Sequence, residues 1–220
     1  MVVSKIVGIG MTSQRARNRL VEKIRSMGIT NEKILEVMRL TPRHYFLEEA
    51  LASRAYDNTA LPIGYGQTIS QPYMVASMTQ ILCETGPMGK VLEIGSGCGY
   101  QTAVLSAFAE KVFAVERIQA LVKRLRANLY ELKVPNVLVK HSDGFNGWAE
   151  HAPFDAILVA AAPVGVPEKL LEQLAVSGRL VIPIGSGRSQ ELRLIKKSST
   201  GFQEQVLDNV SFVPLLDGIE

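Results

Sequence analysis

The stretch that decides the fold is Val91-Leu92-Glu93-Ile94-Gly95-Ser96-Gly97-Cys98-Gly99-Tyr100. Its first four residues predict a buried strand, the glycines at every second position predict a tight turn, and a helix is expected to begin at Tyr100. Gly95 and Gly97 permit positive φ angles and let a ligand approach the backbone closely. Such a turn, after the first strand of a parallel sheet, lies where α/β proteins bind ligands.

Strands and helices alternate on the C-terminal side of this turn. We expect helices at 100–109, 118–132 and 167–175, and strands at 90–94, 111–116, 136–140, 154–160 and 179–184. Apolar side chains recur at helical spacing over 118–132, which predicts an amphipathic helix. Strands separated by helices of this length predict a parallel sheet with helices on both faces.

The two ends of the chain depart from this alternation. Residues 191–196 and 210–213 alternate apolar and polar side chains without a helix between them, which predicts antiparallel strands. The N-terminal part predicts short helices, one capped by Asn31, then an ordered loop at 57–71 and a helix that begins at Pro72. The expected fold class is α/β, a doubly wound, mostly parallel sheet with antiparallel C-terminal strands. The expected single domain, 1–220, comprises a helical extension (1–55), a loop with its leading helix (56–89) and the sheet (90–220).

Composition and charge exclude several classes of protein. The chain is 47% hydrophobic with a formal net charge of +3, so the composition is globular and the charge too small for a nucleic-acid surface. Its two cysteines cannot build a disulfide framework, and its apolar runs are far shorter than the ~20 residues that cross a bilayer. We expect a cytoplasmic monomer that binds neither nucleic acid nor membrane. Basic residues of the first 45 positions, Arg43 among them, and Lys123, Arg124 and Arg126 are interpreted as solvated helix faces.

Two acidic positions extend the glycine turn into a site shaped for a nucleoside. Glu116 ends the next strand, where an acid accepts hydrogen bonds from both ribose hydroxyls. Asp143-Gly144 follows the strand after that, where an adenine edge can be read. The spacing is G-x-G-x-G rather than the dinucleotide pattern G-x-G-x-x-G, which favours S-adenosylmethionine, with S-adenosylhomocysteine as product. The expected cofactor-binding residues are Glu93, Gly95, Ser96, Gly97, Gly99, Tyr100, Glu116, Asp143 and Gly144.

Longer motifs carry a family resemblance. They are DNTALPIGYGQTISQPYMVASMT (57–79), VLEIGSGCGYQTAVL (91–105), VFAVERI (112–118), HSDGFNGWAEHAPFDAILVAAAP (141–163) and GRLVIPIG (178–185). Together they resemble the bacterial protein-L-isoaspartate O-methyltransferase family over roughly residues 12–217. The departures Ser96, Cys98 and Ser142 all keep the side chain small.

The resemblance implies methylation of the free carboxylate of L-isoaspartyl residues in damaged proteins and peptides, which starts repair through a succinimide. It implies that Ser70 is the active-site serine, which positions the carboxylate, and that Gln67 and Thr68 bind substrate. A carboxylate with a pKa of about 4 is ionised at neutral pH and needs no general base. The protein's task is alignment of the reacting atoms. The histidines lack paired metal spacing, so no metal is expected.

Several alternatives stay open on the residues alone. Ser70 can instead cap the helix at Pro72, and Gln67 and Thr68 can instead shape their loop. Competing functions are a methyltransferase for another substrate, a nicotinamide-dependent oxidoreductase and a noncatalytic adenosine-binding module. Ala160-Ala161-Ala162-Pro163 does not match the Asn/Asp-Pro-Pro-aromatic motif of adenine-type amino methylases, the glycine spacing disfavours the oxidoreductase, and an adenosine module does not need the 61–70 loop.

Overall fold

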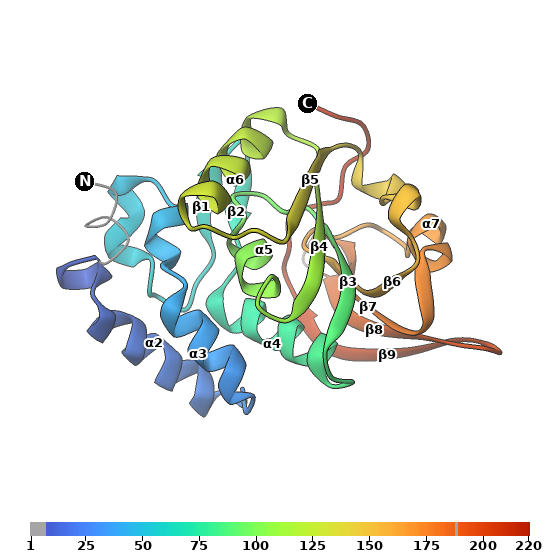
Figure 1. The fold of residues 1–220 in the computed structure, drawn as a ribbon, viewed down its shortest axis with the longest axis horizontal. Coiled ribbons are helices and arrows are strands. Elements are labelled where there is room, and N and C mark those ends of the chain that lie inside the picture. The colour runs from blue at the N-terminus through green and yellow to red at the C-terminus, as the bar shows by residue number, and fades with distance from the viewer. Residues whose placement is uncertain (1–7, 188) are drawn as a thin grey trace.

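A computed structural model describes residues 8–187 and 189–220; the part of the expected extension at 1–7 lies outside them. Its centre is a seven-stranded sheet with the order β5-β4-β3-β6-β7-β8-β9 (Figure 1). Neighbours from β5 to β7 are parallel, and β8 and β9 continue the sheet antiparallel. The strands are β3 (Met88–Ile94), β4 (Ala109–Glu116), β5 (Val137–His141), β6 (Phe154–Val159), β7 (Leu174–Ser186), β8 (Ser189–Ser198) and β9 (Gly201–Val210). The predicted fold class is confirmed.

Helices cover both faces of the sheet. In Figure 1, α4 (Pro72–Cys83), α5 (Tyr100–Leu105) and α6 (Gln119–Glu131) lie on one face, and α7 (Glu168–Glu172) lies on the other. The buried residues of β3 explain why two layers are needed, because Val91 packs in one hydrophobic cluster while Leu92 and Ile94 pack in the other. A strand buried on both faces reads as a near-continuous apolar run; in β3 the run of Val91, Leu92 and Ile94 is interrupted by Glu93, which is itself buried.

The N-terminal extension packs as α2 (Gln14–Ser26) and α3 (Glu32–Leu40). Asn31 caps α3 as predicted, since its side chain accepts hydrogen bonds from the backbone N–H groups of Lys33 and Ile34. The Gln80 side chain of α4 accepts from the backbone N–H groups of Thr30 and Asn31, which ties the turn before α3 to the main body. Short 3-10 helices occur at Gly10–Thr12, Arg43–Phe46, Glu49–Arg54, Gly144–Asn146 and Ala149–His151.

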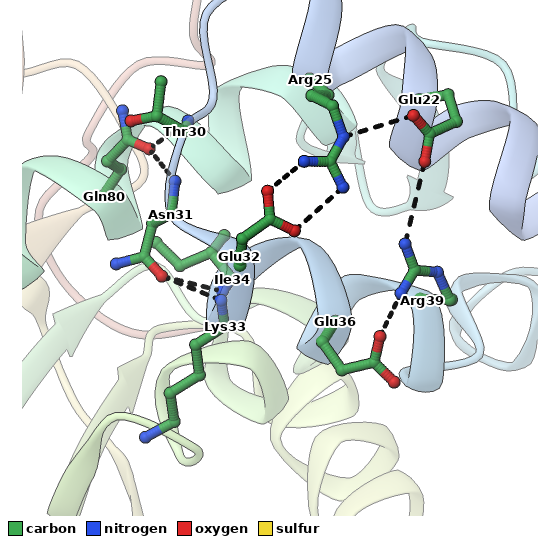
Figure 2. A network of polar contacts seen from close by, with 10 residues as sticks. All are labelled: Glu22, Arg25, Thr30, Asn31, Glu32, Lys33, Ile34, Glu36, Arg39 and Gln80. Atoms are coloured by element: carbon green, nitrogen blue, oxygen red, sulfur yellow. Dashed lines mark hydrogen bonds and ion pairs between the residues drawn. The ribbon is translucent and has the colours of Figure 1, made fainter.

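An ion-pair network joins the outer sides of α2 and α3. Figure 2 shows Arg25 between Glu22 and Glu32, and Arg39 between Glu22 and Glu36. These side chains are largely exposed, so each pair contributes at most about 1 kcal/mol. The solvated-face interpretation holds for this network.

Four predicted elements differ from the structure. The helix expected at 167–175 ends at Glu172, because β7 already begins at Leu174. The 57–71 loop contains a hairpin of β1 (Leu61–Gly64) and β2 (Gln67–Ile69), which its glycines and proline concealed. The helix expected at 100–109 ends at Leu105, because β4 already begins at Ala109. The last strand was predicted at 210–213 but runs over β9; most of its side chains are exposed, so no apolar alternation marks it. None of the helices among the described residues has the length and apolar character needed to cross a membrane.

Candidate active site

The glycine loop between β3 and α5 forms the floor of the site. Gly97 and Gly99 have φ angles of +54° and +91°, a region that side chains with a Cβ rarely adopt. A Cβ on Gly97 would lie 3.2 Å from Cδ1 of Ile63, and one on Gly99 would lie 3.1 Å from Cγ of Leu125. Glycine is therefore required both for the turn and for the close packing of β1 and α6 around it.

Glu116, at the end of β4, holds this loop in place. Its Oε2 accepts a hydrogen bond of 2.8 Å from the backbone N–H of Gly97, and its Oε1 accepts one of 2.9 Å from the N–H of Ile118. The residue is 5% exposed, yet it lines a cavity together with Gly95 and Gly97. Each carboxylate oxygen keeps a second lone pair, so the group can still accept from a ligand.

Gly144, after β5, lies at the same cavity, whereas Asp143 beside it makes contacts within the protein. Oδ1 of Asp143 accepts from the N–H of Phe145 at 2.8 Å, and Oδ2 accepts from the N–H of Gly218 at 2.9 Å. A Cβ on Gly144 would lie 2.5 Å from Cγ2 of Ile94. The three strand ends predicted to share one site are therefore adjacent, in the order β5-β4-β3.

The C-terminal segment, residues 211–220, crosses over this cavity. Val213 and Leu215 form backbone hydrogen bonds with Ala162, and residues 213–216 line the cavity. Glu220 reaches the end of β4, where its N–H donates to the carbonyl of Arg117 at 2.8 Å. The free volume beneath the segment is about 40 Å³. The cavity is therefore narrow in this conformation and bordered by the C-terminal segment, a feature that motif spacing did not reveal.

Glu93 lies on β3 beneath the loop and is fully buried. Burial raises the pKa of its carboxyl group to about 8, and the neighbouring Glu116 reinforces the shift, while the Thr102 hydroxyl opposes it. Neither carboxyl oxygen has a well-formed hydrogen bond among the described residues. Glu93 is thus largely protonated at neutral pH, away from the cavity that Gly95 and Glu116 line.

A second, open groove adjoins the covered cavity and has a volume of about 710 Å³. Thr68, Ala160 and Val213 line both, so they form the wall between them. Ser70 lines the groove and also a small cavity that it shares with the glycine loop. The N-cap of α4 is Gln71, without a side-chain capping bond, so the helix-cap alternative for Ser70 is wrong.

The remaining predicted residues lie around these three cavities. Gln67 and Thr68 line the covered cavity from the hairpin, and the Gln67 amide also donates to the Tyr65 carbonyl at 3.3 Å. Ser96 and Tyr100 line the small cavity beside Ser70. Burial raises the pKa of the Tyr100 phenol, so it stays protonated. Gly99 lies behind the loop, against α6.

Three arginines that were interpreted as solvated are not: Arg17, which is 5% exposed, Arg43 and Arg124. Arg43 is fully buried, donates to the carbonyls of Ala55 and Thr59, and lies over the Tyr100 ring. Arg124 is half-buried and likewise donates to backbone carbonyls. A basic residue is predicted to be exposed unless the sequence shows what its side chain binds. Backbone carbonyls can be acceptors at any position, so the sequence does not reveal such a partner.

Cysteine and metal chemistry find no support among the described residues. Cys83 and Cys98 are both free, and burial raises the pKa of the Cys83 thiol to about 11 and that of Cys98 as well, which keeps them unreactive. The described part of the chain holds no group of three or more His, Cys, Asp and Glu residues able to hold a metal ion.

The sheet order, the glycine loop after β3 and the acid at the end of β4 define an S-adenosylmethionine-dependent methyltransferase. The sequence profile of the family described as "Protein-L-isoaspartate(D-aspartate) O-methyltransferase" matches residues 14–220. The chain belongs to this family and is an O-methyltransferase that acts on isoaspartyl residues.

Individual relatives agree with this assignment. The chain is 56% identical over 208 residues to a protein-L-isoaspartate O-methyltransferase of Pseudomonas paraeruginosa, covering 94% of this chain and 99% of that protein. It is 54% identical over 215 residues to the enzyme of the same name from Alcanivorax borkumensis, covering 98% of each.

Two solved structures share the fold across the chain. One, titled a protein-L-isoaspartate O-methyltransferase, matches with a TM-score of 0.82 and 28% identity, over 90% of this chain and 65% of that one. The other is a putative enzyme of this kind from Plasmodium falciparum in complex with S-adenosyl-L-homocysteine; it matches with a TM-score of 0.78 and 28% identity, over 91% of this chain and 98% of that one.

The lining of the covered cavity fits S-adenosylmethionine in its chemistry. Glu116 supplies the acceptor that a ribose diol needs, and the apolar side chains of Ile94, Val115 and Leu215 supply walls for a flat base. The backbone of Gly95 and Gly97 is open to close approach.

Proposed function

We propose that this chain methylates the free α-carboxylate of L-isoaspartyl residues in an extended polypeptide segment that lies in the groove beside Ser70. The observation that carries the proposal is the position of Ser70, because it lines the groove and, with the glycine loop, one small cavity. A substrate carboxylate at Ser70 is thereby next to the loop that holds the cofactor.

The proposed roles follow from this arrangement. Ser70 donates a hydrogen bond that orients the substrate carboxylate, and Gln67 and Thr68 hold the substrate backbone at the rim of the cofactor cavity. The carboxylate of Glu116 accepts hydrogen bonds from the ribose hydroxyls. The other proposed cofactor-binding residues are Glu93, Gly95, Ser96, Gly97, Gly99, Tyr100, Asp143 and Gly144; of these, Glu93 and Gly99 act from behind the loop.

S-adenosylmethionine supplies a methyl group activated by a sulfonium. The ionised carboxylate oxygen forms the new bond to the methyl carbon as the carbon–sulfur bond breaks, the electron pair stays on sulfur, and no proton moves. The protein therefore needs no general base, and its contribution is to hold the two reactants in line. Because residues 213–216 line the cavity, the C-terminal segment forms one wall of the proposed cofactor site.

The chain's own properties support further expectations about its setting. We propose a cytoplasmic monomer, one domain over 1–220, that acts on isoaspartyl proteins and peptides and not on nucleic acid. Two free cysteines fit a reducing compartment. A net charge of +3 is small for binding to a phosphate backbone.

The test is transfer of a labelled methyl group from S-adenosylmethionine to an isoaspartyl peptide and to its aspartyl twin. We expect base-labile label in the isoaspartyl peptide alone. Label in neither peptide, with protein that is folded and binds S-adenosylhomocysteine, would reject the proposed function. Label in an RNA or DNA substrate instead would favour the competing methyltransferase.

A further inference from the structure

The β1–β2 hairpin carries the proposed substrate residues. Leu61, Ile63 and Ile69 are buried in the main hydrophobic cluster, but this packing leaves the polar residues at its tip to be positioned by other contacts. Its two strands are four and three residues long and pair only with each other. Two-stranded sheets are at best marginally stable on their own, so the position of Gln67 and Thr68 depends on what anchors the hairpin to the rest of the protein.

Arg124, on α6, provides such an anchor. Its Nη1 donates to the carbonyl of Ile63 in β1 at 3.2 Å, and its Nη2 donates to the carbonyl of Phe46 at 2.6 Å. The guanidinium is a rigid fork that presents several donors at once, so one side chain can hold two backbone segments at a fixed separation. Both bonds are charge-assisted and therefore stronger than bonds between neutral groups.

The anchored strand is in contact with the glycine loop. Ile63 is 1% exposed, and its Cδ1 lies 3.2 Å from the place where Gly97 would carry a Cβ. Register then transmits the position of β1 to β2, because Pro62 pairs with Thr68 and Leu61 pairs with Ile69. Arg124 thus fixes the substrate side of the site relative to the cofactor side.

We propose that Arg124 is a positioning residue for methyl transfer: its guanidinium holds the β1–β2 hairpin against the glycine loop and so places Thr68 at the cofactor cavity and Ser70 at the groove beside it. The inference rests on the proposed function, because it assumes that these residues meet the substrate. Arg124 itself is not among the residues that line the covered cavity, the groove or the small cavity.

Arg124→Met tests the inference, since it removes both donors and keeps the apolar stem. A displacement of the reacting groups by about 1 Å can lower the reaction rate by 10²-fold. We therefore expect kcat/KM for the isoaspartyl peptide to fall by about 10- to 100-fold, through both a lower kcat and a higher KM. The Kd of S-adenosylhomocysteine, measured by calorimetry, should change by less than about threefold. Hydrogen exchange at 61–69 should become faster.

Arg126→Met is the matched control. Arg126 is on the same helix, is exposed, and donates to the Val139 carbonyl of β5, away from the hairpin. We expect near wild-type kinetics and unchanged hairpin exchange in this variant. Arg124→Lys can donate to one of the two carbonyls but cannot bridge those of Ile63 and Phe46 as the guanidinium does. It should therefore recover part of the activity lost in Arg124→Met.

Three results would overturn the inference: kcat/KM of Arg124→Met within about threefold of wild type, an equal loss in Arg126→Met, or unchanged exchange in the hairpin. If Arg124→Met does not fold, Arg124→Lys decides, because full activity in that variant refutes a role for the fork. Failure of the proposed function is distinct, since wild-type protein would then leave the isoaspartyl peptide unmethylated.

Discussion

Replacement of Glu116 by alanine has two separate consequences, because one carboxylate anchors the glycine loop and is proposed to hold the ribose. The substitution leaves the N–H groups of Gly97 and Ile118 without their acceptors, at 2.8 and 2.9 Å in the native protein. A hydrogen bond to a charged group contributes about 1.5–3 kcal/mol, so the two bonds together correspond to a loss of about 3 kcal/mol or more in the free energy of unfolding. For a chain of this size each 1 kcal/mol lowers Tm by about 2–4 °C, which predicts a fall of about 6–12 °C.

The loss of a charged partner for the ribose should also weaken S-adenosylhomocysteine binding by about 1–3 kcal/mol, or about 5- to 150-fold in Kd. Scanning calorimetry of the ligand-free protein measures the first effect, and titration calorimetry measures the second. Glu110→Ala is the control, because Glu110 is exposed on the same strand, and it should change neither quantity. An unchanged Tm in Glu116→Ala would refute loop anchoring, and a lower Tm with unaltered affinity would refute the ribose role.

Three further results are expected. Ser70→Ala should lower kcat by about 10- to 100-fold, the equivalent of one lost hydrogen bond to a charged group, with unchanged S-adenosylhomocysteine affinity; a wild-type rate would exclude Ser70 from orienting the carboxylate. Because burial raises the pKa of Glu93 from 4.5 to about 8, its contribution to stability is fully present below pH 4.5 and is lost as the pH rises through 8. Unfolding free energy should therefore fall by up to about 1.4 kcal/mol per pH unit across that interval, and denaturant melts of Glu93→Gln should show a flatter dependence; an identical slope in both proteins would contradict this. Among the residues that the structure describes, Asp208 is the one charged side chain that lines the groove, so peptides with Lys near the isoaspartyl residue should have a KM about twofold lower than peptides with Glu at low salt. Asp208→Asn should remove the difference, and a difference that persists in Asp208→Asn would place the discrimination elsewhere.

The alternating strands and helices and the glycine loop could be predicted because each is determined by residues close together in the sequence. The β3 strand is marked by the apolar residues Val91, Leu92 and Ile94. The turn is marked by glycines that adopt positive φ, and α6 by apolar residues at helical spacing. The predicted convergence of Gly95, Glu116 and Gly144 at one cavity also follows from local information, because consecutive parallel strands present their carboxyl ends at the same edge.

The hairpin and the last strand were missed because nothing local distinguishes them. β1 and β2 are short and punctuated by glycine and proline, so they read as a loop until their pairing is seen. β9 exposes most of its side chains and is a strand because β8 offers it an edge to pair with. Pairing across distant residues, rather than side-chain pattern, makes both of these strands.

The sequence by itself determined the class of fold, the glycine turn and the residue types that the chemistry requires, since propensity, hydrophobic period and turn geometry act over a few residues. The tertiary structure alone decided which polar groups are buried and what they hold. Arg43 and Arg124 bind carbonyls of the segment that leads into Ser70. Burial raises the pKa of Glu93 beneath the loop, and the C-terminal segment forms a wall of the cavity beside Gly95. The burial of a polar side chain and its hydrogen-bond partners depend on residues far apart in the sequence, so both are decided only when the chain has folded.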